Sequence, residues 1–124
     1  MFQQDLIYFE IHQNQITATN VDTHISATTI DVNSFHHQRG PIINFEEAQQ
    51  TILNLFKKVK RRSLLRPRCI VHYLPQLNDG LSVIEKRTLK ELVLNFSSDK
   101  VFLLETPNKL TNAELTSLKP KLKL

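Results

Sequence analysis

Residues 66–105 read RPRCIVHYLPQLNDGLSVIEKRTLKELVLNFSSDKVFLLE, and this stretch decides the fold. Two apolar runs, at residues 68–74 and 100–104, have the length and composition of buried strands. Between them, Ser82 and Glu85 have the spacing of a capping box, so a helix is predicted to begin there. The order strand, helix, strand predicts a βαβ unit with parallel strands, and such units bind ligands at the carboxyl ends of their strands.

The turn that follows the first of these strands does not resemble a phosphate-binding loop. Residues 75–80 contain one glycine, Gly80. A phosphate loop needs glycines so that backbone amides can approach the phosphate oxygens. The stretch therefore predicts a fold and names no activity.

Three short segments upstream alternate with turns. Residues 5–12, 15–21 and 24–32 are rich in β-branched and aromatic residues, which predicts a three-stranded antiparallel meander. A polar loop is expected at residues 33–40. Asn44 then has the position of an N-cap. After it, apolar residues recur at helical spacing and predict the first long helix: Phe45, Ala48, Ile52, Leu55, Phe56 and Val59.

The element order is therefore βββ-α-β-α-β, followed by a short C-terminal helix that begins near Thr111 and is expected to end at Pro120. This order predicts an α/β fold with a five-stranded mixed sheet, because right-handed crossovers between parallel strands place the helices on the sheet. The arrangement is ribonuclease-H-like, and it also forms the core of each half of actin-like ATPases. Residues 1–107 are expected to form a single domain and residues 108–124 a helical tail.

Length and composition indicate a small globular protein. The chain has 124 residues, of which 40% are hydrophobic, enough for one domain with its own core. It has no apolar run of the roughly 18 residues that a membrane span needs. Its N-terminus lacks the basic region of a signal peptide. A single cysteine, Cys69, excludes an intramolecular disulfide. We therefore expect a cytoplasmic, bacterial-type protein without a membrane span.

Positive charge is concentrated in one segment. The formal net charge is +4, but seven cations and no acid lie between residues 57 and 68, so the rest of the chain carries −3. Cations at a helix C-terminus are favoured by the helix dipole, which is one explanation. A site for an anionic partner is the other. The seven residues are Lys57, Lys58, Lys60, Arg61, Arg62, Arg66 and Arg68, and we expect Arg61, Arg62 and Arg66 to be exposed.

Four segments together resemble a known family: residues 41–48 (PIINFEEA), 66–68 (RPR), 80–88 (GLSVIEKRT) and 101–107 (VFLLETP). They resemble consecutive parts of the N-terminal subdomain IA of MreB, the bacterial actin-like protein that organises rod-shaped growth. The likeness runs from about residue 5 to residue 107. The chain also resembles the small YjaA type of bacterial protein, which is closer to it in length. Proteins of this type are described as stress-associated and have no established chemistry.

Several positions depart from the MreB pattern, whose first strand carries an aspartate and runs into a glycine-containing phosphate loop. Phe9 stands where that aspartate would be, and residues 11–14 contain no glycine. MreB has an acid just before the proline that follows its last core strand, and this acid helps to orient the attacking water. Thr106 occupies that position here, although Glu105 is one position away. The second phosphate loop and the adenosine pocket have no counterpart here. The resemblance therefore implies an actin-like domain that is not an enzyme and holds no cofactor.

Nuclease and nucleophile chemistry have little support. A nuclease of this fold class needs clustered carboxylates that hold two divalent metals. The candidates would be Glu10, Glu105 and Asp79, but no second acid lies near Glu10 on its face of the strand. Cys69 has no evident base, because His72 lies three residues further along a strand and so faces the other side.

The histidines do not have the spacing of a metal site either. Two of them, His36 and His37, are adjacent and point apart in an extended chain. The other three fall on different predicted strands: His12, His24 and His72. No metal site and no catalytic residue are predicted.

The sequence thus favours interaction over catalysis. We expect a non-catalytic regulatory module that binds a protein partner, in the context of the MreB cytoskeleton, cell shape or the stress response. The seven cations are the candidate contact residues, and the strand at residues 24–32 is a second surface, which could pair with another copy through a sheet edge. The alternative is a nucleic-acid-binding accessory protein that uses the same cations, although residues 57–68 contain no aromatic residue for base stacking.

Overall fold

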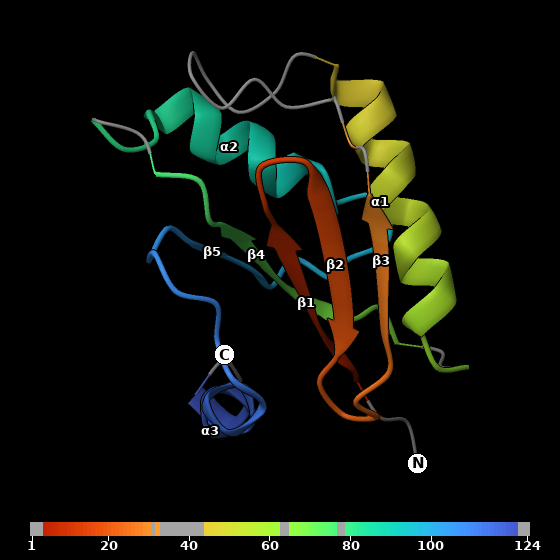
Figure 1. The fold of residues 1–124 in the computed structure, drawn as a ribbon. Coiled ribbons are helices and arrows are strands. Elements are labelled where there is room, and N and C mark those ends of the chain that lie inside the picture. The colour runs from red at the N-terminus through yellow and green to blue at the C-terminus, as the bar shows by residue number, and fades with distance from the viewer. Residues whose placement is uncertain (1–3, 31, 33–43, 63–64, 77–78, 122–124) are drawn as a thin grey trace.

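The computed structural model describes residues 4–30, 32, 44–62, 65–76 and 79–121. One mixed sheet contains five strands in the order β3-β2-β1-β4-β5. Helices α1 and α2 cover one face of the sheet, and α3 packs on the other (Figure 1). The predicted α/β class and the order βββ-α-β-α-β are confirmed. The polar loop expected at residues 33–40, with its two adjacent histidines, lies outside the described residues.

The first three strands form the predicted antiparallel meander. β1 (Leu6–Ile11) pairs with β2 (Gln15–Asn20), and β2 pairs with β3 (Ser26–Ile30). β4 (Arg68–Tyr73) and β5 (Val101–Leu104) are added in parallel on the other side of β1. β1 and β4 are buried along their whole length, because both faces of the central strands are covered by helices.

The capping signals mark where the first two helices begin. α1 (Phe45–Val59) follows Asn44, whose side chain accepts a hydrogen bond from the N–H of Glu47 at 3.0 Å. α2 (Val83–Glu91) follows Ser82, which forms the predicted reciprocal capping box with Glu85. After α2 the chain continues in turns to Phe96. The apolar side chains of both helices pack on one face of the sheet and form the main core, which includes Phe9, Ala18, Ile52, Leu55, Val71, Leu89 and Phe96.

The third helix, α3 (Asn112–Lys121), closes the opposite face. Its Leu115 is 2% exposed and packs in a second apolar cluster with Leu6, Tyr8 and Ile70. The helix continues one residue past Pro120, where the sequence analysis expects it to end. A proline lacks the N–H that would continue the hydrogen-bond pattern of the helix, and the described helix ends at the next residue.

A buried chain of hydrogen bonds fixes the segment between β5 and α3. The hydroxyl of Tyr8 accepts the N–H of Leu110 at 3.0 Å, and its own proton is directed at Nδ1 of His72, 2.6 Å away. The other ring nitrogen of His72 donates to the carbonyl oxygen of Thr106 at 2.8 Å. Burial lowers the pKa of His72, in keeping with a neutral ring that carries one proton. The start of the C-terminal segment is thereby tied to the central strands.

Candidate interaction surface

The C-terminal end of α1 carries three of the predicted cations. Lys57 and Lys58 occupy the last turn, where the negative end of the helix dipole favours positive charge. Lys60 ends the helix in an extended conformation, and its N–H donates to the carbonyl oxygen of Phe56 at 2.9 Å. All three lysine side chains are exposed. Their charges therefore face solvent at one corner of the domain.

Arg61 is partly buried and bound to Asp5, which corrects the expectation that it would be exposed. Its guanidinium holds the carboxylate of Asp5 through Nε at 2.9 Å and also through Nη2, and 34% of its side chain is accessible. The N–H of Arg61 and the amide of Asn20 donate to the same carboxylate, at 3.4 and 3.0 Å. Burial by itself would raise the pKa of Asp5, but the hydrogen bonds from Arg61 and Asn20 hold it below its usual value.

Arg62 and Arg66 are exposed, as predicted. Arg66 reaches across to the turns after α2, where Nη2 donates to the carbonyl oxygen of Asn95 and Nη1 to that of Ser97, both at 3.3 Å. Two backbone acceptors therefore fix the direction of the Arg66 side chain. Arg62 makes no hydrogen bond or ion pair with the described part of the chain, so its charge is open to a partner.

Arg68 does not belong to this surface, which corrects the prediction that it is one of seven contact residues. It is the first residue of β4 and only 5% exposed, and burial lowers the pKa of its guanidinium. Because side chains alternate along a strand, Arg68 lies on the same face as Ile70, the face that α3 covers. The remaining cations lie on α1 and on the connection between α1 and β4.

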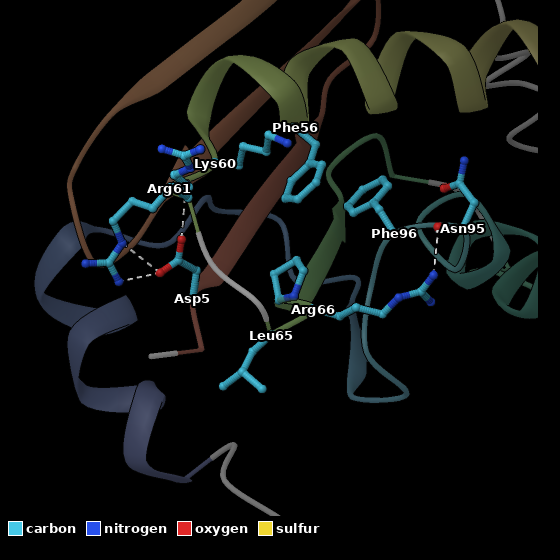
Figure 2. A pocket seen from close by; sticks show the side chains of 10 residues that line it. Asp5, Phe56, Lys60, Arg61, Leu65, Arg66, Asn95 and Phe96 are labelled. Atoms are coloured by element: carbon cyan, nitrogen blue, oxygen red, sulfur yellow. Dashed lines mark hydrogen bonds and ion pairs between the residues drawn. The ribbon is translucent and has the colours of Figure 1, made fainter. Parts of the chain in front are cut away.

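A groove of about 380 Å³ lies between this connection and the turns after α2. Figure 2 shows the rings of Phe56 and Phe96 facing each other beside it; their centroids are 4.2 Å apart and the rings are stacked. The ammonium of Lys60 lies 6.0 Å from the centroid of Phe56. We call this site the basic groove, and its lining is Asp5, Phe56, Lys60, Arg61, Arg62, Leu65, Arg66, Pro67, Asn95 and Phe96.

The basic groove offers two kinds of contact. Lys60, Arg62 and Arg66 present exposed positive charge, which suits carboxylate or phosphate groups. Leu65 is 43% exposed, and Phe56, which also lines the groove, is half-buried. Such apolar surface contributes to binding only when the partner also brings an apolar group. The combination therefore suits a segment that carries both acidic and apolar side chains.

No local signal in the sequence points to the residues that complete the groove. Asp5 lies 56 residues before Arg61, so no local spacing connects the two. Phe96 reads as one more member of an apolar stripe, and Asn95 carries no signal of its own. These residues enter the site only because the strand order brings the start of β1, the end of α1 and the turns after α2 together.

The positions at which the MreB likeness expects nucleotide chemistry hold structural contacts. Phe9 is completely buried in the main core. The carboxylate of Glu105 accepts the N–H of Leu81 at 3.1 Å and lies 3.4 Å from the ammonium of Lys86. Glu105 thereby holds the start of α2 next to Gly80, whose φ of +68° favours glycine.

The other candidate groups do not converge. In the described ranges, no three His, Cys, Asp or Glu side chains gather as metal ligands. Glu10 lies beside His12, whereas Asp79 is exposed near the start of α2. Cys69 is buried, and this burial raises the pKa of its thiol to about 12, so the thiolate needed for nucleophilic attack is scarce at neutral pH.

Comparison with known proteins finds a likeness in structure and no match in sequence. No protein-family model matches the chain, and no curated protein matches it. The fold resembles the crystal structure of MreB 5 of Spiroplasma citri bound to AMPPNP, with a TM-score of 0.57 and 13% identity. The match covers 85% of this chain and 39% of that chain. At this identity the likeness shows an actin-like fold, and the resemblance to YjaA-type proteins stays a prediction. Within the described residues, no helix is long and apolar enough to cross a membrane.

Proposed function

We propose that the chain is a non-catalytic, actin-like interaction module whose basic groove binds an acidic, partly apolar segment of a protein partner. The observation that carries this proposal is the position of the exposed cations Lys60 and Arg62 beside the apolar surface of Phe56 and Leu65. The actin-like fold supports an MreB-type filament, or a protein that regulates one, as the first partner to test. The cellular context would be cell shape or the stress response.

Two positions support the absence of catalysis. Phe9 takes part in core packing, and Glu105 takes part in holding the start of α2. Phe9 is a buried apolar side chain, and the carboxylate of Glu105 is already engaged by the N–H of Leu81 and the ammonium of Lys86. The module would therefore act through what it binds and would hold no cofactor.

Binding to nucleic acid is the second candidate function. It is favoured by the exposed cations on one corner of the domain, which include Lys57 and Lys58 besides the groove residues. Contacts to phosphates release counterions, so such binding falls steeply as salt rises and tolerates any base sequence. Binding of an acidic and apolar protein segment falls less with salt, because burial of apolar surface contributes to it.

The test is co-sedimentation of the chain with polymerised MreB from the same cell, after nuclease treatment and at two salt concentrations. The double variant Lys60→Glu with Arg62→Glu is expected to bind at least roughly tenfold more weakly, because it places two repelling charges in the groove. The matched control is Arg87→Glu with Lys90→Glu, which makes the same change in net charge on exposed positions of α2. Equal loss in both variants would contradict a groove-specific contact. Binding that requires added RNA or DNA would favour the second candidate.

The edge of the sheet is a second candidate surface, for pairing with another copy of the chain. β3 is the last strand in the sheet order, and Ile30 at its end is 65% exposed. Edge strands without charge pair readily with other strands, and a lysine discourages such pairing. We expect Ile30→Lys to shift any dimer seen by sedimentation velocity to monomer. A dimer that persists in this variant would place self-association elsewhere.

A further inference from the structure

A row of polar side chains crosses the sheet on the face that α3 covers. Glu10, near the end of β1, is paired in register with His72 of β4 on one side and with Thr17 of β2 on the other. Thr17 is in turn paired with Thr28 of β3. The row therefore spans four strands. Its carboxylate belongs to Glu10, whereas the preceding residue, Phe9, faces the other side of the sheet and belongs to the apolar core.

An open cavity of about 520 Å³ lies over this row. The sheet forms one wall, and the start of α3 with the segment before it forms the other. The volume lies in the range of pockets that hold small molecules, roughly 300–1,000 Å³. This cavity shares no lining residue with the basic groove. The charged or titratable side chains of its lining are Glu10, His12 and Lys109, and the hydroxyl groups beside them on the sheet belong to Thr17, Thr19, Ser26 and Thr28.

Glu10 is a nearly buried carboxylate in the wall of this cavity. The residue is 5% exposed, and its Oε1 lies 3.2 Å from Nε2 of His12, a side chain that is 32% accessible. Its other carboxylate oxygen has no hydrogen bond within the described part of the chain. Burying a carboxylate is unfavourable unless hydrogen bonds or an opposite charge compensate for it. Lys109 also lines the cavity but is exposed and forms no ion pair with Glu10 within the described residues, so an ammonium group of a ligand would supply both.

The hydroxyl groups beside Glu10 can bind further polar groups. Thr17 and Thr28 share one hydrogen bond between their Oγ1 atoms at 2.8 Å, and Thr19 shares one with Ser26 at 2.9 Å. Each such pair uses one of its two protons, so one donor and several lone pairs remain. A ligand with hydroxyl groups could satisfy them, whereas an apolar ligand would leave them without water or partner.

We propose that this cavity binds a small hydroxyl-rich amine of the amino-sugar class. The ammonium group pairs with the carboxylate of Glu10, and the ligand hydroxyls hydrogen-bond to the two hydroxyl pairs of β2 and β3. The site takes no part in the binding proposed for the basic groove, so either proposal can fail alone.

The test is an NMR titration of the folded chain with three probes of graded chemistry. Glucosamine carries both the ammonium and the hydroxyl groups, N-acetylglucosamine keeps the hydroxyls without the charge, and putrescine keeps charge without hydroxyls. Saturable shifts of the amides of Thr17 and Thr28 are expected with glucosamine. The other two probes should bind at least roughly tenfold more weakly, since a hydrogen bond to a charged group contributes about that much. No saturable shift with glucosamine, or equal affinity for all three probes, would overturn the proposal.

Two variants locate the binding. Glu10→Gln keeps the size of the side chain and removes its charge, and it should weaken glucosamine binding at least roughly tenfold. Thr28→Val lies on the exposed edge strand, so the fold should tolerate it, and it should weaken binding about fivefold by removing one hydroxyl. Arg62→Ala, in the basic groove, is the control and should leave glucosamine affinity unchanged. Unchanged affinity in Thr28→Val together with Glu10→Gln would contradict the assigned site.

Discussion

Replacement of Phe9 by aspartate is expected to unfold the domain, although it places an acid where the MreB pattern has one. Phe9 is completely buried, and its ring lies 5.9 Å from that of Phe96 in the main core. The substitution removes a large apolar side chain, which alone costs about 3–5 kcal/mol. It also buries a carboxylate without a partner. The total is comparable with the 5–15 kcal/mol that stabilises a typical domain.

The measurement is urea unfolding followed by circular dichroism, with a thermal-shift assay in the presence of ATP and Mg²⁺. Phe9→Leu is the matched control, because it keeps an apolar side chain and should stay folded with a loss of about 1 kcal/mol. A folded Phe9→Asp variant whose melting temperature rises with ATP would mean that the strand still supports a nucleotide site. That result would count against a non-catalytic module.

Asp5→Ala is expected to have the second largest effect, a loss of about 2–3 kcal/mol in the free energy of unfolding. The substitution leaves the guanidinium of Arg61 and the buried amide of Asn20 without their shared acceptor. This lies at or below the lower end of the roughly 3–5 kcal/mol for a broken buried pair, because Arg61 remains 34% accessible and solvent compensates part of its charge. Urea unfolding at pH 7 measures the loss. Glu91→Ala removes an exposed acid at the end of α2 and should change stability by less than about 0.5 kcal/mol.

The same pair predicts a pH dependence. Burial alone would raise the pKa of Asp5, but Arg61 and Asn20 lower it below the ordinary value of 3.8. Because the folded state binds the proton less tightly than the unfolded state, the pair contributes its full stability above about pH 4 and loses it as the pH falls through the folded pKa. The difference in stability between the native chain and Asp5→Ala should therefore shrink in acid. A difference that stays constant down to pH 2 would show that packing, and not charge, is lost in the variant.

Local signals in the sequence predicted the elements of this fold. Asn44 and Ser82 cap helices because their side chains accept the N–H groups that the first turn leaves without partners, an interaction within three residues of the chain. Apolar periodicity distinguished strands from helices, because apolar residues recur at every second position in a half-buried strand and at every third or fourth position in a helix. The order of elements then restricted the topology, because βαβ crossovers are right-handed. These features depend on neighbours in the sequence, so the sequence alone determined them.

The makeup of the basic groove was decided by the tertiary structure. Arg61 and Arg62 are adjacent and identical in the sequence, yet Arg61 is held by a carboxylate 56 residues away and Arg62 stays exposed. Arg68 is buried because β4 begins at that residue, and the alternation of side chains then places it on the face of the sheet against which α3 packs. Which cation meets a partner therefore depends on strand register and on contacts between distant segments, and a pattern of charges along the chain contains neither.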